Sequence, residues 1–249
     1  MKQKIVRGES AFNLLELLIA LVVIVILAAL IMPLPPSPKA KMMRISCVNN
    51  LKQIGTAYRI WENDNGDRLP SQQTISNGGW REFLTKANQG AICWTNYQIM
   101  DHEMGQSPQV LWCPADERHP GTNFFTKFGN TNISYFVGVD ACDTAPQSIL
   151  GGDRNLGPGS TPGRDYGFSP KNGQGNDVAV PISGPVCWSL KMHSLGNSTG
   201  AGNILMGDGS TQQTTSANFQ RTWLSNAPPT TNWPAGHVPA SPSIRLIFP

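Results

Sequence analysis

An apolar run over residues 12–32 constrains this chain more than any other feature of its sequence. The run contains one charged side chain, Glu16. A bilayer core about 30 Å thick needs about 20 apolar residues, because an α-helix rises about 1.5 Å per residue. The length therefore predicts a transmembrane helix. A carboxylate in hydrocarbon costs about 2.5–3.5 kcal/mol on insertion scales, so we expect Glu16 to have a partner and a function.

Residues 1–11 are basic, with Lys2, Lys4 and Arg7 against Glu9. Positive charge beside an apolar span predicts a cytoplasmic N-terminus and places the remainder of the chain outside the cytoplasm. A secretory signal peptide has an apolar run of only about 7–15 residues followed by a cleavage site. The longer run here predicts a single-pass anchor, and the plainest alternative is an ordinary signal-anchor helix that tolerates one Glu.

Residues 11–16, AFNLLE, resemble the type IV prepilin motif, in which a small residue, usually Gly, precedes Phe and a Glu stands fifth in the mature chain. The resemblance implies cleavage between Ala11 and Phe12 by a prepilin peptidase, followed by N-methylation of Phe12. It also implies that Glu16 pairs with the new amine of a neighbouring subunit during assembly. The implied partners are the peptidase, other pilin-like subunits and an inner-membrane assembly platform.

The remaining sequence divides by composition. Residues 33–38 contain four prolines and predict a break. Residues 39–65 predict an amphipathic helix, because residues spaced three and four apart fall on one largely apolar side. These residues are Arg44, Cys47, Leu51, Ile54, Tyr58 and Trp61. Residues 66–249 predict a loop-rich domain, since the chain has 25 Gly and 20 Pro. The net charge of +3 includes no long basic run, so no nucleic-acid partner is expected.

The expected fold is α+β and pilin-like, with a long N-terminal helix packed on a small antiparallel sheet with long loops. We expect a short helix at 79–84 and a strand or turn at 110–116, a variable surface loop over 140–185, and a surface tail after 226. Asp208-Gly209 predicts a hairpin turn. Short strands are expected at 133–139, 148–150, 178–180, 186–188, 204–206 and 211–215.

Two further stretches resemble prepilin-type proteins of planctomycete- and verrucomicrobia-like bacteria. Residues 46–70 match their Cys-x-x-Asn-Leu-Lys-Gln-Ile-Gly helix and following loop, and His193 with Asp208-Gly209 matches a C-terminal signature of that family. The family has nine residues between the His and the Asp-Gly pair, whereas fourteen separate them here. The resemblance marks His193, Asp208 and Gly209 for a structural role.

The chain has five cysteines, an odd count that leaves at least one unpaired. Disulfides are allowed outside the cytoplasm. We expect Cys47, on the amphipathic helix, to be free. The other four allow three connectivities, of which we prefer Cys93–Cys113 with Cys142–Cys187. The absence of a Cys-x-x-Cys pair and of zinc-type His spacing disfavours a structural zinc site.

Three other groups of residues give weaker indications of metal binding or catalysis, and each is more simply explained as part of a surface loop. Cys113, Asp116, Glu117 and His119 could form a ligand cluster. Calcium could bind through Asp140, Asp143 and Asp153, although no EF-hand spacing is present. Residues 196–200 fit a Gly-x-Ser-x-Gly pattern that would join Ser198, Asp208 and His237 in a hydrolase, but no helix follows the Ser.

The expected function is that of a non-enzymatic subunit without a cofactor, in a type II secretion or type IV pilus-like filament. One alternative is a pilin-anchored binding module that recognises glycans or another substrate, and a less favoured one is the membrane-anchored hydrolase. Burial of Trp80, Trp94, Trp112 and Trp188 would weaken the binding alternative.

Overall fold

The computed structural model describes residues 13–31, 37–84, 93–142, 144–170, 179–182, 184–196, 198–224 and 244–249. The chain divides into two compact units, Met1–Lys39 and Ala40–Pro249, which are considered separately. Within the described part of the chain, no helix has the length and apolar character needed to cross a membrane. The predicted cleavage site at Ala11 and Phe12 lies outside the described residues.

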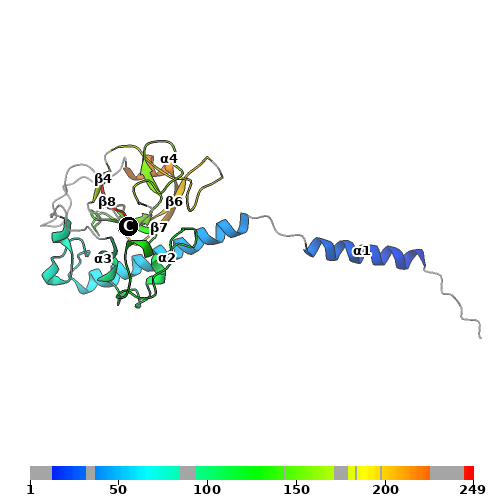
Figure 1. Ribbon diagram of the computed structural model, residues 1–249, viewed down its shortest axis with the longest axis horizontal. Coiled ribbons are helices and arrows are strands. Elements are labelled where there is room, and N and C mark those ends of the chain that lie inside the picture. The colour runs from blue at the N-terminus through cyan, green and yellow to red at the C-terminus, as the bar shows by residue number, and fades with distance from the viewer. Residues whose placement is uncertain are drawn as a thin grey trace, which may run out of the picture. The chain divides into compact units, whose positions relative to one another are not determined.

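The first unit contains α1 (Leu14–Ile31), the dark blue helix of Figure 1. Asn13 stands at its start, where its side-chain oxygen accepts the main-chain N–H of Leu15 at 3.4 Å, in the manner of an N-cap. The large apolar side chains described on α1 are exposed, from 48% at Val23 to 81% at Leu14. This helix is apolar all round and buries none of these side chains within its own unit.

Helix α2 (Ser37–Asp64) occupies the predicted amphipathic segment and begins two residues earlier than expected. Pro38 falls in its first turn, where proline is tolerated because the first N–H groups have no intrahelical partner. The predicted apolar side is confirmed, since five of its six members are buried: Cys47, Leu51, Ile54, Tyr58 and Trp61.

The main sheet has six strands in the order β4-β8-β1-β2-β6-β7, with antiparallel neighbours throughout. A separate pair is formed by β3 (Leu156–Pro158) and β5 (Val186–Trp188). The strands of the six-stranded sheet are β1 (Tyr135–Gly138), β2 (Ile149–Asp153), β4 (Val180–Ile182), β6 (Ala201–Met206), β7 (Thr211–Thr215) and β8 (Ile244–Ile247).

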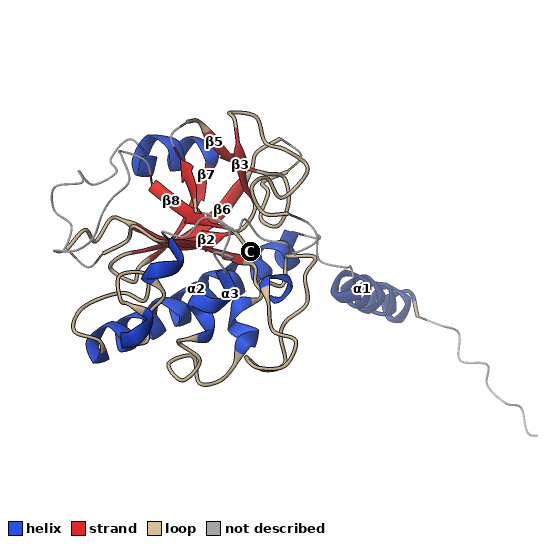
Figure 2. Cartoon of the chain, turned by 60° about the vertical axis from the view of Figure 1, so that its left-hand side comes forward, coloured by secondary structure: helices blue, strands red, loops and turns tan. Residues whose placement is uncertain are grey.

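Side chains alternate across the sheet and build two cores. Tyr135 and Leu205 belong to the core that includes the buried side of α2, whereas Phe136 and Ile204 belong to the core of the opposite face. Figure 2 shows α2 and the short α3 (Cys93–Gln98) together on one side of the sheet. A Cβ on Gly55 of α2 would stand 2.8 Å from Leu205 Cδ1, so glycine permits this close approach of helix and strand.

Short helical turns complete the second unit. The short helix predicted at 79–84 is present as a 3₁₀ turn, and the segment predicted as strand or turn at 110–116 starts in another. The turns are η1 (Ile75–Asn77), η2 (Arg81–Leu84), η3 (Pro108–Leu111), η4 (Asn130–Asn132), α4 (Ser216–Asn218) and the π-helical η5 (Phe219–Leu224).

The predicted strands correspond to β1, β2, β4, β5, β6 and β7, each within a few residues, and the sequence analysis missed β3, β8 and α3. Two further expectations are wrong. The predicted surface tail ends in β8, whose Leu246 and Ile247 are buried between β4 and β1. The predicted surface loop over 140–185 contains the two strands expected within it, β2 and β4, but also β3 and the fully buried residues 153–155, so its placement at the surface is wrong. For β3 and β8, polar and Pro-rich composition outweighed the signal of a strand of three or four residues.

Candidate functional site

A disulfide joins Cys47 on α2 to Cys113, just after η3, with the two Cα atoms 5.2 Å apart. The predicted free Cys47 and the predicted Cys93–Cys113 bridge are therefore wrong. The buried side of α2 carries Cys47 inward to Cys113, whereas the Cys93 thiol lies on α3 and contacts the carbonyl of Tyr135 at 3.6 Å.

The predicted Cys142–Cys187 bridge is also wrong, because both residues are free and buried. Cys142 Sγ lies 3.3 Å from the hydroxyl of Thr144, and Cys187 Sγ lies 3.1 Å from the carbonyl of Thr161. Each thiol thus has a local oxygen partner. Nearness in sequence was no guide to the pairing, since the observed bridge spans 66 residues.

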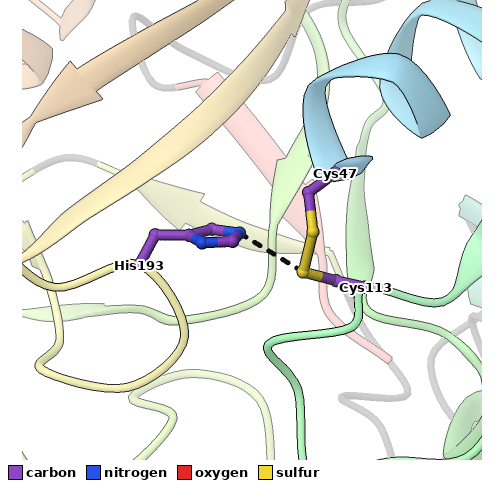
Figure 3. A group of neighbouring side chains, drawn as sticks. All are labelled: Cys47, Cys113 and His193. Atoms are coloured by element: carbon purple, nitrogen blue, oxygen red, sulfur yellow. Dashed lines mark hydrogen bonds between the residues drawn. A yellow bond between two sulfur atoms is a disulfide. The ribbon is translucent and has the colours of Figure 1, made fainter. Parts of the chain in front are cut away.

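His193 packs against this disulfide (Figure 3). Its Nε2 lies 3.2 Å from Cys113 Sγ and 3.6 Å from Asp153 Oδ2, and its side chain is 1% exposed. We call the group of Cys47, Cys113, Asp153, His193 and Asn203 the disulfide–histidine centre. It joins α2, the end of β2, the start of β6 and two loops at one buried point.

Asp153 uses only half of its hydrogen-bonding capacity. Its Oδ2 accepts the main-chain N–H and the side-chain amide of Asn203, at 2.7 and 2.8 Å. Its Oδ1 is buried and has no hydrogen-bond partner among the described residues, and the same holds for Asn203 Oδ1 and Arg44 Nε. Buried polar groups are usually satisfied, so unpaired atoms around one carboxylate are unusual.

Burial dominates the ionisation of this centre. It raises the pKa of Asp153 to about 7, although hydrogen bonds from Asn203 and the charge of Arg44 act in the opposite direction. It lowers the pKa of His193 to about 4, and Arg44 lowers that pKa further. At neutral pH the imidazole is therefore uncharged, and its 3.6 Å contact with Asp153 is not an ion pair.

A second buried polar group, which we call the arginine centre, comprises Asp116, Arg118, Arg154 and Ser169. Arg154 donates two hydrogen bonds of 2.7 Å to the carboxylate of Asp116 and one of 3.2 Å to Ser169 Oγ. Arg118 donates to Ser169 Oγ and to the carbonyl oxygens of Asn130, Ile133, Pro170 and Pro249. The arginine centre ties loops that are far apart in sequence.

In the arginine centre, charge pairing outweighs burial for Asp116 but not for Arg118. Burial by itself would raise the pKa of Asp116, but the hydrogen bonds and charge of Arg154 outweigh it, and the pKa is lowered. Burial and the neighbouring Arg154 lower the pKa of Arg118 to about 10, so the guanidinium stays charged at neutral pH.

A cavity of about 280 Å³ lies beside the arginine centre. The Arg154 guanidinium stacks over the ring of Tyr166 at 3.4 Å, and the Lys191 ammonium lies 5.5 Å from the same ring. The cavity could take a small polar ligand. Its lining comprises Arg164, Asp165, Tyr166, Gly167, Ser169, Pro170 and Lys191.

The residues of the predicted C-terminal signature fall at two places. His193 is buried against the disulfide, whereas Asp208 is exposed in the β6–β7 turn and accepts the N–H of Ser210 at 2.8 Å. Gly209 has a φ of 80°, the left-handed conformation that such a turn requires. Arg59 of α2 donates to the carbonyl of Gly207 at 3.2 Å, so the hairpin turn docks on the helix.

The predicted calcium site is not assembled by its described residues. Asp140 binds Arg245, accepting its main-chain N–H at 2.9 Å and its Nε at 3.0 Å, while Asp153 belongs to the disulfide–histidine centre. Asp143 lies outside the described residues.

The ligand cluster considered as an alternative to a surface loop is dispersed as well. Cys113 is bonded to Cys47, Asp116 pairs with Arg154, Glu117 pairs with Lys191, and His119 is exposed.

For the predicted hydrolase residues, Ser198 and Asp208 are exposed in separate turns, and His237 lies outside the described residues. Among the four tryptophans considered for ligand binding, Trp80 and Trp188 are buried, and Trp94 and Trp112 are partly buried. Two of the four are thus unable to serve as a surface platform.

Sequence reasoning missed Asn203, Arg118 and Arg154, and assigned Asp153 to a different site. The one usable signal was a run of polar residues, 153–155, placed directly after an apolar strand. Comparisons with models of protein families, with curated proteins and with solved structures found no match to this chain.

Proposed function

We propose that this protein is a prepilin- or pseudopilin-like subunit. It is cut between Ala11 and Phe12, N-methylated at Phe12 and held in the inner membrane, with residues 66–249 on the periplasmic side. It then joins a type II secretion or type IV pilus-like filament. The observation that carries the proposal is the AFNLLE motif at the start of the apolar run. Anchoring rests on the sequence of residues 12–32.

The two N-terminal helices support the proposal. Helix α1 is apolar all round and exposes its large side chains, and helices of that kind are normally buried by lipid or by other helices. Helix α2 has one buried side, which packs against the antiparallel sheet. The pilin-like arrangement needs both kinds of helix, one for packing among subunits and one for carrying a domain.

The Cys47–Cys113 disulfide also supports it, because disulfides persist mainly outside the reducing cytoplasm. Glu16 has a physical role in this proposal. Cleavage creates a positive amine on Phe12, and in a low-dielectric bundle a carboxylate is strongly stabilised by such an amine on a neighbouring subunit. The pair would fix the register between subunits.

Mass spectrometry of the mature N-terminus tests the processing step. We expect a methylated chain beginning at Phe12 in cells that have prepilin peptidase and an intact leader in cells that lack it. A chain that keeps Met1 in both, or is cut beyond Met32, would contradict the proposal. A Glu16→Ala variant should still be cut but should assemble poorly, with Glu16→Asp as the control that keeps the charge.

The cavity beside Tyr166 favours a second candidate function, a displayed binding module for a small polar ligand such as a glycan. Arg164 supplies positive charge and Asp165 supplies negative charge, whereas Lys191 is paired with Glu117 and the Tyr166 ring is buried under Arg154. Binding of charged oligosaccharides, measured by calorimetry, should be lost in Arg164→Ala and kept in Phe125→Ala, which removes an exposed aromatic ring elsewhere. Equal binding by both variants would exclude this cavity as the site.

A further inference from the structure

The disulfide–histidine centre brings together side chains of the types that bind zinc. The sulfur atoms of Cys47 and Cys113 and a ring nitrogen of His193 all lie within 4.8 Å of one another. The Asp153 carboxylate is not part of this three-residue group, although its Oδ2 lies 3.6 Å from His193 Nε2. Zinc in proteins is typically held by four ligands of these kinds in a tetrahedron.

We propose that the reduced form of this protein, with Cys47 and Cys113 as thiols, binds one Zn²⁺ through Cys47, Cys113 and His193, with water as the fourth ligand. The metal then fastens α2 to the sheet domain in place of the disulfide. Sequence spacing gave no sign of this site, because its ligands come from three separate segments of the chain.

One distance in the oxidised centre already fits a tetrahedral ion. Metal–ligand bonds of about 2.0–2.3 Å place neighbouring ligand atoms about 3.3–3.8 Å apart. The Cys113 Sγ to His193 Nε2 distance of 3.2 Å is close to that range. The two sulfur atoms must separate from a covalent bond to about 3.8 Å, and reduction of the disulfide permits this movement.

An unsatisfied carboxylate oxygen is a second, independent observation. Asp153 is fully buried, and its Oδ1 has no hydrogen-bond partner in the described part of the chain. A water molecule bound to the zinc would donate a hydrogen bond to this oxygen. The second oxygen, Oδ2, is held by two hydrogen bonds from Asn203, which fix the orientation of the carboxylate.

The charges of the site balance. Two thiolates and one carboxylate exceed the charge of Zn²⁺ by one negative charge. Arg44 is close enough to Asp153 to stabilise its ionised form, and its buried Nε has no hydrogen-bond partner among the described residues. One guanidinium therefore neutralises the loaded site, which matters because uncompensated buried charge is costly.

Loading requires a reductant. A water-soluble phosphine breaks the S–S bond, takes up oxygen from water to become the phosphine oxide, and leaves two thiols on the protein. Zinc then displaces one proton from each thiol and binds the two thiolates. The free dithiol of a newly made chain, before oxidation, would not need the first step.

The test uses the full chain in detergent, reduced with a phosphine under argon, given ZnCl₂ and separated from free metal by gel filtration. We expect one zinc per chain in the reduced protein and none in the oxidised protein, by elemental mass spectrometry. Cobalt in place of zinc should give the absorption of a tetrahedral thiolate complex. Equal zinc in both redox forms would overturn the proposal.

Variants locate the site. Cys113→Ser should abolish binding, and His193→Gln and Asp153→Asn, which keep both thiols and similar shapes, should each weaken affinity at least tenfold. Cys187→Ser removes a buried free thiol that is not one of these ligands and should bind zinc as the unmodified chain does. Full binding by His193→Gln, or loss of binding in Cys187→Ser, would place the metal elsewhere and overturn the proposal.

Discussion

The two buried polar centres of the domain stabilise a buried carboxylate in different ways. In the arginine centre, the Asp116 carboxylate meets Arg154 through two 2.7 Å hydrogen bonds, and Arg118 is surrounded by carbonyl oxygens. In the disulfide–histidine centre, Asp153 keeps one oxygen unpaired within the described residues and faces an uncharged His193. Paired charge makes the first centre insensitive to conditions near neutral pH, while the second depends on pH and redox state.

The largest expected effect comes from breaking the paired charges. Arg154→Met should lower the free energy of unfolding by about 3–5 kcal/mol, because it leaves the buried Asp116 carboxylate without its partner. Urea unfolding followed by circular dichroism measures the loss. Arg164→Met, at an exposed arginine, should change stability by no more than about 0.5 kcal/mol. Similar losses in both variants would mean that the arginine centre is not a stabilising ion pair.

Removal of the disulfide should rank next. Its loss should lower the free energy of unfolding by about 2–5 kcal/mol, since the bridge closes a long loop in the unfolded chain. Thermal unfolding with and without a phosphine reductant measures it. The matched control is the Cys47→Ser/Cys113→Ser double variant, which should be equally destabilised and should not respond to the reductant. A response in the double variant would show that another bridge exists.

The pH dependence of the metal-free, oxidised protein separates Asp153 from His193. The pKa of Asp153 is raised to about 7, so its contribution to stability is lost as pH rises from about 4 to 7. The pKa of His193 is lowered to about 4, so its contribution is lost as pH falls from about 6.5 to 4. The two effects oppose each other, and the stability of the unmodified protein should change little between about pH 4 and pH 6.5.

Single variants should expose each effect. Stability should fall with rising pH in His193→Gln and with falling pH in Asp153→Asn, by up to about 1.4 kcal/mol per pH unit. Urea unfolding at pH 4.5, 5.5 and 6.5, values inside the window given by the two pKa shifts, measures both slopes. Slopes of the same sign in the two variants would contradict the assignment of opposite shifts.

The smallest effect concerns a turn outside both centres. Gly209→Ala places a side chain at a φ of 80° and should cost about 1 kcal/mol, without altering the pH slopes or the response to reductant. Gly129→Ala is the control, because that glycine is extended and has open space around it. A larger loss in Gly209→Ala, or a changed pH slope, would link this turn to His193 and contradict their independence.

Local patterns in the sequence predicted local structure well. The spacing of Leu51, Ile54 and Tyr58 identified the buried side of α2, and Asp208-Gly209 identified the β6–β7 turn. These features depend on residues within a few positions of one another. They were enough to predict helix α2, the β6–β7 hairpin and the α+β fold class.

The two centres depend on distant residues, and no local pattern predicts them. Asp153 and Arg154 are adjacent in sequence, yet one enters the disulfide–histidine centre and the other enters the arginine centre. Successive residues of an extended chain point in opposite directions, so one dipeptide can serve two sites. Polar composition then placed both residues in a surface loop, although both are buried.

The position of β8 sets the order in which this domain can form. Ile247 pairs with Val137 and Ile244 pairs with Ile182, so a late segment of the chain separates two strands made much earlier. Until residues 244–247 are free to pair, β1 and β4 each keep an unpaired edge, and open edges invite pairing with other chains. Such distant pairing slows folding. The six-stranded sheet is therefore completed only when β8 inserts between β4 and β1, and until then β1 exposes an open edge to neighbouring chains.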